Sequence, residues 1–372
     1  MSKSILTTAD FDYSLPDELV AHEPLSNRSE SKLLVHKNGV NSDHSFQEIS
    51  QLIPKGSLVV MNDTKVLPGR LLGKTSHGGS IEIMLLEPLA FSGDDQNHCR
   101  WKALGKPMKK LKPGTNISFA SELNGTILDK IETHTGPVIH IEFDRSEHAF
   151  TDWLNEHGFI PLPPYIRRLD PLPASQSPDT SRYQTVFANH SGSVAAPTAG
   201  LHFTDSILND FEKNDIKVAK VTLHVGGGTF LPVKADDPSS HHMHKEQFTI
   251  SDTTYHAIQS ALEENRPIIT VGTTSFRALQ GFHVLAQAHP IESLLNKRLS
   301  TDIFIYPKNR KDLHKPWAVK GIMTNFHQPK STLFMLICAL VGYDKAYEIY
   351  AHAIENQYRF YSYGDTSLLW LE

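Results

Sequence analysis

Cysteine is scarce in this sequence, since only Cys99 and Cys338 occur among its 372 residues. Two cysteines cannot build the disulfide framework of a small secreted protein, so a reducing compartment is expected. No basic segment followed by an apolar one comes after Met1, so no secretory signal is expected. The apolar run at residues 333–341 is too short to span a bilayer. We therefore predict a cytoplasmic protein without a membrane partner.

Several familiar catalytic motifs are also missing. The sequence contains no GxSxG, no Walker motif, no GxGxxG, no HExxH and no CxxC, which argues against the standard hydrolase, kinase and NAD-dependent classes. The net charge is −5, so the overall field does not attract nucleic acid. Local basic clusters at residues 106–112, 167–168 and 308–311 are more typical of solvated loops than of an RNA site.

The length of the chain and a change in its pattern of expected strands and helices predict two domains. Residues 71–144 contain short alternating segments separated by turns, which is typical of a small antiparallel barrel or sandwich. Strands alternate with helices before and after this region. We expect a mixed α/β main domain with an inserted small antiparallel β-barrel domain. Residues 1–68 and 152–372 would form the discontinuous catalytic domain, and residues 69–151 the insertion.

Within the main domain, residues 58–61 form a continuous apolar run, the mark of a strand buried on both faces. Further strands are expected at residues 267–271, 303–306 and 322–324, and final helices at residues 330–341 and 344–356. Residues 159–181 are rich in proline, which excludes regular structure and indicates a functional or mobile segment.

Three consecutive glycines, Gly226, Gly227 and Gly228, separate two expected strands. The missing Cβ atoms would let backbone N–H groups approach a ligand closely. His224 and Thr229 flank the glycines and would project polar groups toward such a ligand. A glycine-rich hairpin turn without any ligand remains the alternative.

Three other strand exits share this design. Residues 194–204 carry Thr198, Gly200 and His202, with Thr204 placed as a helix N-cap. In residues 269–279, a strand is followed by a helix N-terminus that suits a carboxylate or phosphate; its residues are Gly272, Thr273, Thr274, Ser275 and Arg277. In residues 324–335, Asn325 and His327 precede a predicted first helical turn that contains Lys330, Ser331 and Thr332.

A lysine in the first turn of a helix opposes the macrodipole, so Lys330 suggests a bound anion. Ordinary capping explains any one of these turns. Together with the glycine triplet, they favour one ligand cavity at the ends of strands.

The histidine-rich segment at residues 241–246 suggests a metal site, because His242, His244 and Glu246 would share one face of a strand. No second cluster completes a coordination shell. A histidine or glutamate acting as general base is favoured instead.

Seven ordered blocks carry a resemblance to a known family: NDTKVLPGRL, AAPTAGLHFT, LHVGGGTFLPV, MHKE, VGTTSFRAL, TNFHQPKSTLFML and RFYSYGDTSLL. The chain resembles the S-adenosylmethionine:tRNA ribosyltransferase-isomerase family of queuosine biosynthesis. The resemblance implies transfer and isomerisation of the ribosyl moiety of S-adenosylmethionine onto 7-aminomethyl-7-deazaguanine at the tRNA wobble position. The product would be epoxyqueuosine-tRNA, with release of adenine and methionine.

This reaction would need a general base for the acidic C5′ hydrogens, a hydrogen-bond donor near the leaving adenine, and an anion site for the methionine carboxylate. It implies S-adenosylmethionine as co-substrate, tRNA as substrate, no prosthetic group and no metal; we also expect a monomer. The catalytic candidates are Asp63, which would position the amine, and four possible bases, His202, His224, His244 and Glu246. The substrate-binding candidates are Thr198, Gly200, Gly226, Gly227, Gly228, Thr229, Gly272, Thr273, Thr274, Ser275, Arg277, Asn325, His327, Lys330, Ser331 and Thr332. Lys65, Arg70, Arg182, Arg359 and the β insertion would contact tRNA.

Two alternatives remain open from the residues alone. One is a non-catalytic RNA-binding protein whose glycine-rich turns are structural. The other is a metallohydrolase that uses the cluster at residues 241–246.

Overall fold

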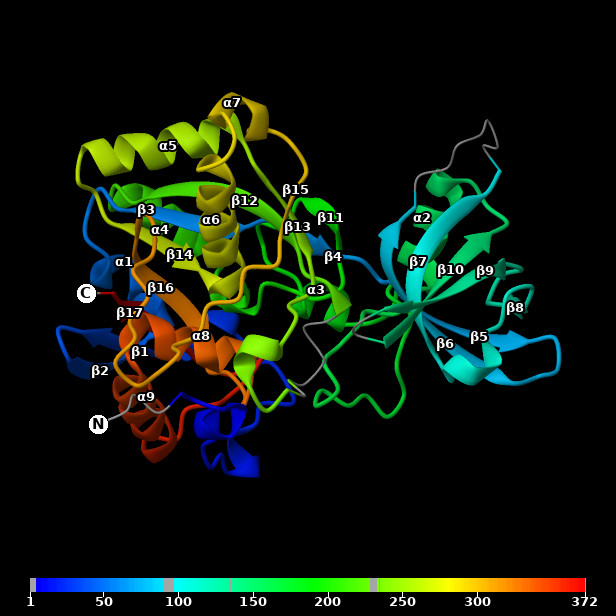
Figure 1. The fold of residues 1–372 in the computed structure, drawn as a ribbon, viewed down its shortest axis with the longest axis horizontal. Coiled ribbons are helices and arrows are strands. Elements are labelled where there is room, and N and C mark those ends of the chain that lie inside the picture. Colours follow the sequence, from blue (N-terminus) through cyan, green and yellow to red (C-terminus); the bar gives the residue numbers. More distant parts are fainter. Residues whose placement is uncertain (1–4, 90–96, 134–135, 228–232, 234, 372) are drawn as a thin grey trace.

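The computed structural model describes residues 5–89, 97–133, 136–227, 233 and 235–371. These residues form two lobes, a main lobe built on a large sheet and a smaller barrel lobe (Figure 1). The mixed α/β fold with a closed antiparallel barrel confirms the predicted fold class. The division into domains at residues 69 and 151 stays a prediction.

The described part of the main lobe contains one nine-stranded sheet. In spatial order its strands are β15 (Leu299–Thr301), β13 (Glu246–Ile250), β12 (Lys217–His224), β3 (Leu58–Asn62), β14 (Ile268–Val271), β16 (Val319–Asn325), β17 (Thr366–Trp370), β1 (Lys32–Lys37) and β2 (Val40–Ser45). The central strands β12, β3, β14 and β16 are mutually parallel. Their carboxyl ends therefore lie at one edge of the sheet, where ligands commonly bind in α/β folds.

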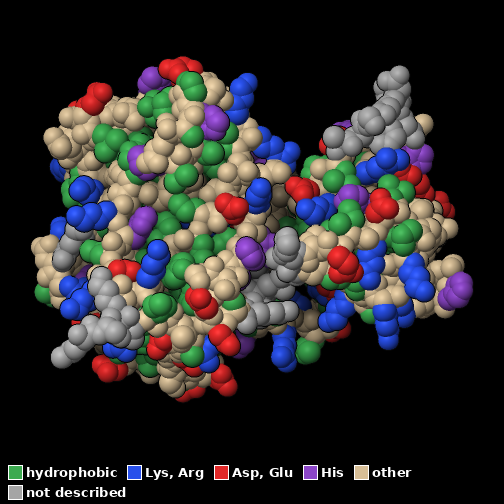
Figure 2. Space-filling view, viewed as in Figure 1, with side chains coloured by type: hydrophobic (Ala, Val, Ile, Leu, Met, Phe, Trp, Pro, Cys, Tyr) green, Lys and Arg blue, Asp and Glu red, His purple; other side chains and the backbone are tan. Residues whose placement is uncertain are grey.

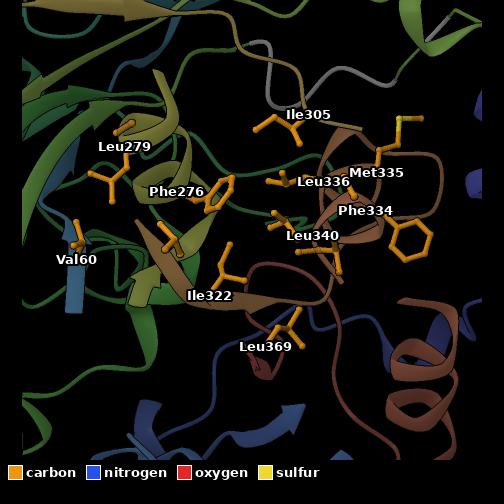
Figure 3. Packing of buried hydrophobic residues seen from close by; sticks show 14 of the residues in the cluster. Val60, Phe276, Leu279, Ile305, Ile322, Phe334, Met335, Leu336, Leu340 and Leu369 are labelled. Carbon is orange, nitrogen blue, oxygen red and sulfur yellow. The ribbon is translucent and has the colours of Figure 1, made fainter. Parts of the chain in front are cut away.

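Helices cover both faces of this sheet, because neighbouring residues of its buried strands point to opposite sides. In β3, Val60 packs into the core on one face and Val59 into the core on the other. The first face carries α5 (Asp252–Glu263), α6 (Gly272–Ala286), α8 (Thr332–Val341) and α9 (Tyr343–Glu355), and the second carries α1 (Ile49–Leu52) and α4 (Asp205–Lys213). Figure 3 shows Phe276, Ile322 and Leu340 gathered in the first of these cores.

The barrel lobe closes through antiparallel pairs in the order β10, β7, β6, β5, β8, β9. These strands are β5 (Arg70–Thr75), β6 (Ser80–Pro88), β7 (Cys99–Lys106), β8 (Asn116–Ser118), β9 (Asn124–Thr133) and β10 (Gly136–Phe143). Helix α2 (Glu147–His157) starts at the N-cap Ser146, and Phe150 and Trp153 pack on the barrel core. The chain then returns to the main lobe, where β4 (Thr64–Val66) pairs with β11 (His190–Ser193). The remaining short helices are α3 (Asp179–Arg182) and α7 (Ile291–Leu294).

Some sequence predictions of secondary structure are wrong. Residues 303–306 form no strand; their alternating pattern reflects packing, since the rings of Phe304 and Tyr306 stack at 4.6 Å. Residues 241–245 are irregular and β13 begins only at Glu246, so His242 and His244 do not share a strand face with it. The expected second strand after the glycines, residues 230–232, lies outside the described residues. No helix of the described chain has the length and apolar character to cross a membrane.

Candidate functional site

The four predicted turns meet at the carboxyl edge of the central strands. They line one cavity of about 710 Å³, which we call the strand-end cavity. Gly226 follows β12, Gly272 follows β14, and Asn325 ends β16. Thr198 comes from a 3₁₀ turn (Thr198–His202) that precedes Thr204. Thr204 is the predicted N-cap of α4, and its side chain accepts a hydrogen bond from the Ile207 N–H at 3.3 Å. The sequence prediction that these turns converge is confirmed.

Helix α6 points its N-terminus at this cavity. Gly272 has φ +81°, a conformation that favours glycine, and the N-cap Val271 provides no side-chain cap. Thr273 and Thr274 line the cavity, and the buried Thr274 Oγ1 has no hydrogen-bond partner among the described residues. Because an uncapped helix N-terminus presents free N–H groups and a partial positive charge, it suits an anionic group.

A buried ion pair stands beside this helix start. Nη1 of Arg277 donates to Oε2 of Glu246, and both side chains line the cavity. Arg277 is 7% exposed and Glu246 is 5% exposed. Nε and Nη2 of Arg277 have no partner among the described residues. The pair therefore fixes the Glu246 carboxylate and leaves two guanidinium donors for another acceptor.

His202 lies behind the wall of the strand-end cavity rather than in it. Its Nε2 lies 3.2 Å from Asn325 Oδ1, and its Nδ1 lies 2.8 Å from the Ser31 hydroxyl. Asn325 Nδ2 donates to backbone carbonyls, so Oδ1 faces His202, which must donate from Nε2. Burial lowers the pKa of His202 to about 4. This neutral ring orients Asn325, and its predicted role as a base candidate does not fit its position.

His327 is a second buried histidine, and it does line the cavity. Its Nε2 lies 2.9 Å from the Thr324 hydroxyl, and burial lowers its pKa to about 3. The imidazole is therefore neutral near neutral pH and can serve as a hydrogen-bonding group rather than a cation.

The predicted position of Lys330 in the first turn of a helix is wrong. Lys330 precedes the N-cap Ser331 of α8 instead of lying in the first helical turn, and it has φ +57°. Its ammonium group lies 2.6 Å from the Asp12 carboxylate. The anion that the macrodipole argument demanded is therefore provided by the protein itself. Ser331 caps the helix by accepting from the Phe334 N–H at 3.1 Å, and Thr332 begins it.

A second cavity of about 710 Å³ lies between the two lobes, and we call it the inter-lobe cavity. Leu86, Lys102 and Leu104 line it from the barrel, and His224, Gly226 and Gly227 line it from the main lobe. Figure 2 shows the hollow between the lobes with lysine and arginine side chains near its rim. The two cavities share four wall residues, Val225, Gly226, Met243 and His244.

Of the predicted catalytic residues, His224 at the end of β12 lines the inter-lobe cavity, whereas Asp63, just after β3, lines neither cavity. The carboxylate of Asp63 is buried, accepts from the Thr222 hydroxyl at 2.6 Å and lies 3.7 Å from Nε2 of His190. His224 Nδ1 lies 2.8 Å from the Thr64 hydroxyl, and burial lowers the pKa of this ring. Burial also lowers the pKa of His244, in the shared wall. Asp63 and His224 therefore do not share a cavity with Glu246.

Other predicted binding residues lie away from the strand-end cavity. The Gly200 backbone packs on Phe187 and Thr185, so close that a Cβ would lie 2.8 Å from Thr185 Cγ2. The Ser275 hydroxyl donates to Val271 O at 2.8 Å within its own helix. Gly227 packs against Leu86 of the barrel. Gly228 and Thr229 lie outside the described residues.

The cations predicted to contact tRNA mostly bind groups of the protein itself. Arg70 pairs with Glu82 at 3.0 Å. Arg182 donates to the carbonyls of Leu25 and Ser26, and Arg359 to that of Glu23. Lys65 is exposed on β4. Tethering of the segment around residues 23–26 is thus a structural role that sequence reasoning did not assign to Arg182 and Arg359.

The strand-end cavity also contains residues that sequence reasoning did not single out. Tyr165 from the proline-rich segment meets Tyr361 at a ring distance of 4.9 Å, and its hydroxyl lies 2.5 Å from that of Ser362. The proline-rich composition and the aromatic block around Tyr361 were the available signals. Neither signal indicated that these two distant segments form one wall.

The fold and the cavities define a mixed α/β protein with an inserted barrel and a polar ligand site at the carboxyl edge of its sheet. A family model described as "Queuosine biosynthesis protein" matches residues 8–369. A relative from Azoarcus sp. (strain BH72), named S-adenosylmethionine:tRNA ribosyltransferase-isomerase, is 41% identical over 98% of this chain and 97% of its own length. A relative of the same name from Treponema denticola is 38% identical over 98% of this chain and 100% of its own length.

A solved structure extends this similarity. The crystal structure of an S-adenosylmethionine tRNA ribosyltransferase from Thermotoga maritima aligns with a TM-score of 0.50 and 28% identity, over 97% of this chain and 99% of that one. This chain belongs to the S-adenosylmethionine:tRNA ribosyltransferase-isomerase family of queuosine biosynthesis.

Proposed function

We propose that this protein transfers the ribosyl moiety of S-adenosylmethionine to 7-aminomethyl-7-deazaguanine at the tRNA wobble position and isomerises it. The products are epoxyqueuosine-tRNA, adenine and methionine. The observation that carries the proposal is the convergence of four strand exits on one cavity at the carboxyl edge of the sheet. Membership of the family supports it.

The strand-end cavity is the proposed site of S-adenosylmethionine. The N-terminus of α6 and the unpartnered donors of Arg277 receive the methionine carboxylate. Gly226 lets the adenosine approach the main chain, because nothing lies within 4 Å of a Cβ built there. Glu246 and His244 are the base candidates that we keep, because both line the cavity.

Adenine release tests the base assignment. Glu246→Gln should abolish release in the presence of tRNA even at temperatures where the variant is shown to stay folded, because the amide cannot accept the C5′ proton. His202→Ala should lower release less, because His202 acts only through the orientation of Asn325. Full activity of Glu246→Gln would remove Glu246 from the chemistry.

The reaction itself is tested by incubating the protein with S-adenosylmethionine and undermodified tRNA, followed by mass analysis of the tRNA nucleosides. Epoxyqueuosine should appear together with free adenine and methionine. A non-catalytic RNA-binding protein would bind the tRNA and leave S-adenosylmethionine intact.

Glu246 would be the strongest metal ligand of the metallohydrolase alternative, but its carboxylate is paired with Arg277. Within the described chain, no group of three or more His, Cys, Asp or Glu side chains is placed to hold a metal ion. Activity that survives a chelator would agree with the transferase proposal. The cytoplasmic location and the monomeric state stay predictions from the sequence.

A further inference from the structure

The inter-lobe cavity has no role in the proposal for S-adenosylmethionine, yet it is as large as the strand-end cavity. We propose that it is the acceptor site, which receives the modified nucleotide of the RNA and presents it to the strand-end cavity. This inference rests on the proposed function, because it assigns the second substrate to a place.

The first argument is the shared wall. A group transfer requires the donor carbon and the acceptor amine to come within bonding distance. Val225, Gly226, Met243 and His244 line both cavities. At Gly226 a Cβ would meet no atom within 4 Å, so the main chain there leaves open space. Substrates that enter from the two sides therefore meet at this wall.

The second argument is charge. Lys245 and Arg298 are exposed side chains that line the inter-lobe cavity, and no ion pair within the described chain involves either. Lys102 also lines it, but pairs with Glu87 at 3.0 Å. Burial lowers the pKa of His224, and the positive charge of Arg298, which lines the same cavity, lowers it further. Two free cations at the rim suit the phosphates that flank a nucleotide.

The third argument is the composition of the walls. The barrel supplies Leu86, Leu104 and Val138, apolar side chains that can contact the face of a base. The main lobe supplies polar groups, among them Thr222, His224 and Gln247. Gln247 donates to Glu87 at 3.1 Å and so links the two lobes across the cavity. One nucleotide can therefore touch both lobes, which gives the barrel a role in acceptor binding.

The test is the double charge reversal Lys245→Glu/Arg298→Glu in the full chain. Its matched control is Lys55→Glu/Lys320→Glu, which has the same change of charge. Lys320 is the second residue of β16, and Lys55 precedes β3. Both controls are exposed at the amino edge of the parallel strands, away from the two cavities. The affinity for undermodified tRNA is measured at several salt concentrations, with the affinity for S-adenosylmethionine and the melting temperature measured in parallel.

We expect the Lys245/Arg298 variant to bind tRNA about tenfold or more weakly. The slope of log affinity against log salt concentration should become shallower by about one to two. Its affinity for S-adenosylmethionine and its melting temperature should match those of the wild type, and the KM for tRNA should rise more than kcat falls. The control should keep its tRNA affinity within about twofold.

Equal losses in both double variants, or unchanged tRNA binding in the Lys245/Arg298 variant, would overturn the acceptor site. In either case, epoxyqueuosine formation by the wild type would leave the proposed function standing. If the wild type binds tRNA but forms no product from S-adenosylmethionine, the proposed function fails instead.

Discussion

Removing the charge of Glu246 should destabilise the main lobe strongly. In Glu246→Gln, the Arg277 guanidinium keeps its charge but loses its only partner among the described residues, and only 7% of the Arg277 surface is exposed. Breaking a buried ion pair by removing one member costs about 3–5 kcal/mol of folding free energy. Replacing both members, as in Glu246→Gln/Arg277→Met, should recover part of this loss, because no uncompensated charge stays buried.

Hydrogen exchange resolved by peptide measures the free energy of local opening in β13 and α6, the two elements that carry Glu246 and Arg277. This choice avoids mixing the unfolding of the main lobe with that of the barrel, which has its own core. The control is Glu264→Gln, which breaks a 2.9 Å pair with Arg266 on an exposed side chain and should change little because water screens it. A loss in Glu246→Gln no larger than in this control would refute the buried-pair argument.

Two further predictions concern stability. Burial lowers the pKa of His202 to about 4 and that of His327 to about 3, from 6.5, so the unfolded chain binds more protons than the folded one below pH 6.5. Stability should be complete above pH 6.5 and fall as the pH drops toward 4, by about 3 kcal/mol from His202 alone, and urea unfolding of His202→Gln should show a shallower decline. At Gly158 a Cβ would lie 2.1 Å from Pro68 O and 2.6 Å from Leu154 O, so Gly158→Ala should lower the melting temperature by the equivalent of about 1–3 kcal/mol. Gly226→Ala, which meets open space, should leave it unchanged; equal shifts in the two variants would contradict the steric argument.

The sequence predicted well those parts of the fold that depend on the local order of apolar and polar residues. The apolar run that became β3 is buried at every position, and continuous apolarity reports burial on both faces. The barrel strands were predicted because a small barrel fills its interior with every second residue, as Ile81, Ile83 and Leu85 do in β6. The convergence of the turns followed from the rule that parallel strands end at one edge.

The wrong predictions concern residues whose surroundings depend on partners that are distant in the sequence. Lys330 lies beside Asp12, a residue from the other end of the chain, and no local pattern announces that pair. His202, Ser31 and Asn325 come from three separate segments of the chain, and the burial of His202 depends on the other two. Strand β17 was missed because its pairing with β1 and β16 is long-range and its sequence lies within an aromatic tail. Local sequence thus identified the turns but not the contacts between them.

The position of β17 has a consequence for biosynthesis. Strand β1, at residues 32–37, joins the sheet on one side only through β17, at residues 366–370, and its other neighbour is the edge strand β2. The six strands of the barrel, by contrast, all lie between residues 70 and 143. During translation, the barrel can therefore form once its strands and α2 have left the ribosome, while the β1–β2 hairpin can join the sheet only when nearly the whole chain has been made. Until then its apolar residues Leu33 and Leu34, both fully buried in the finished protein, need cover from a chaperone or from non-native contacts.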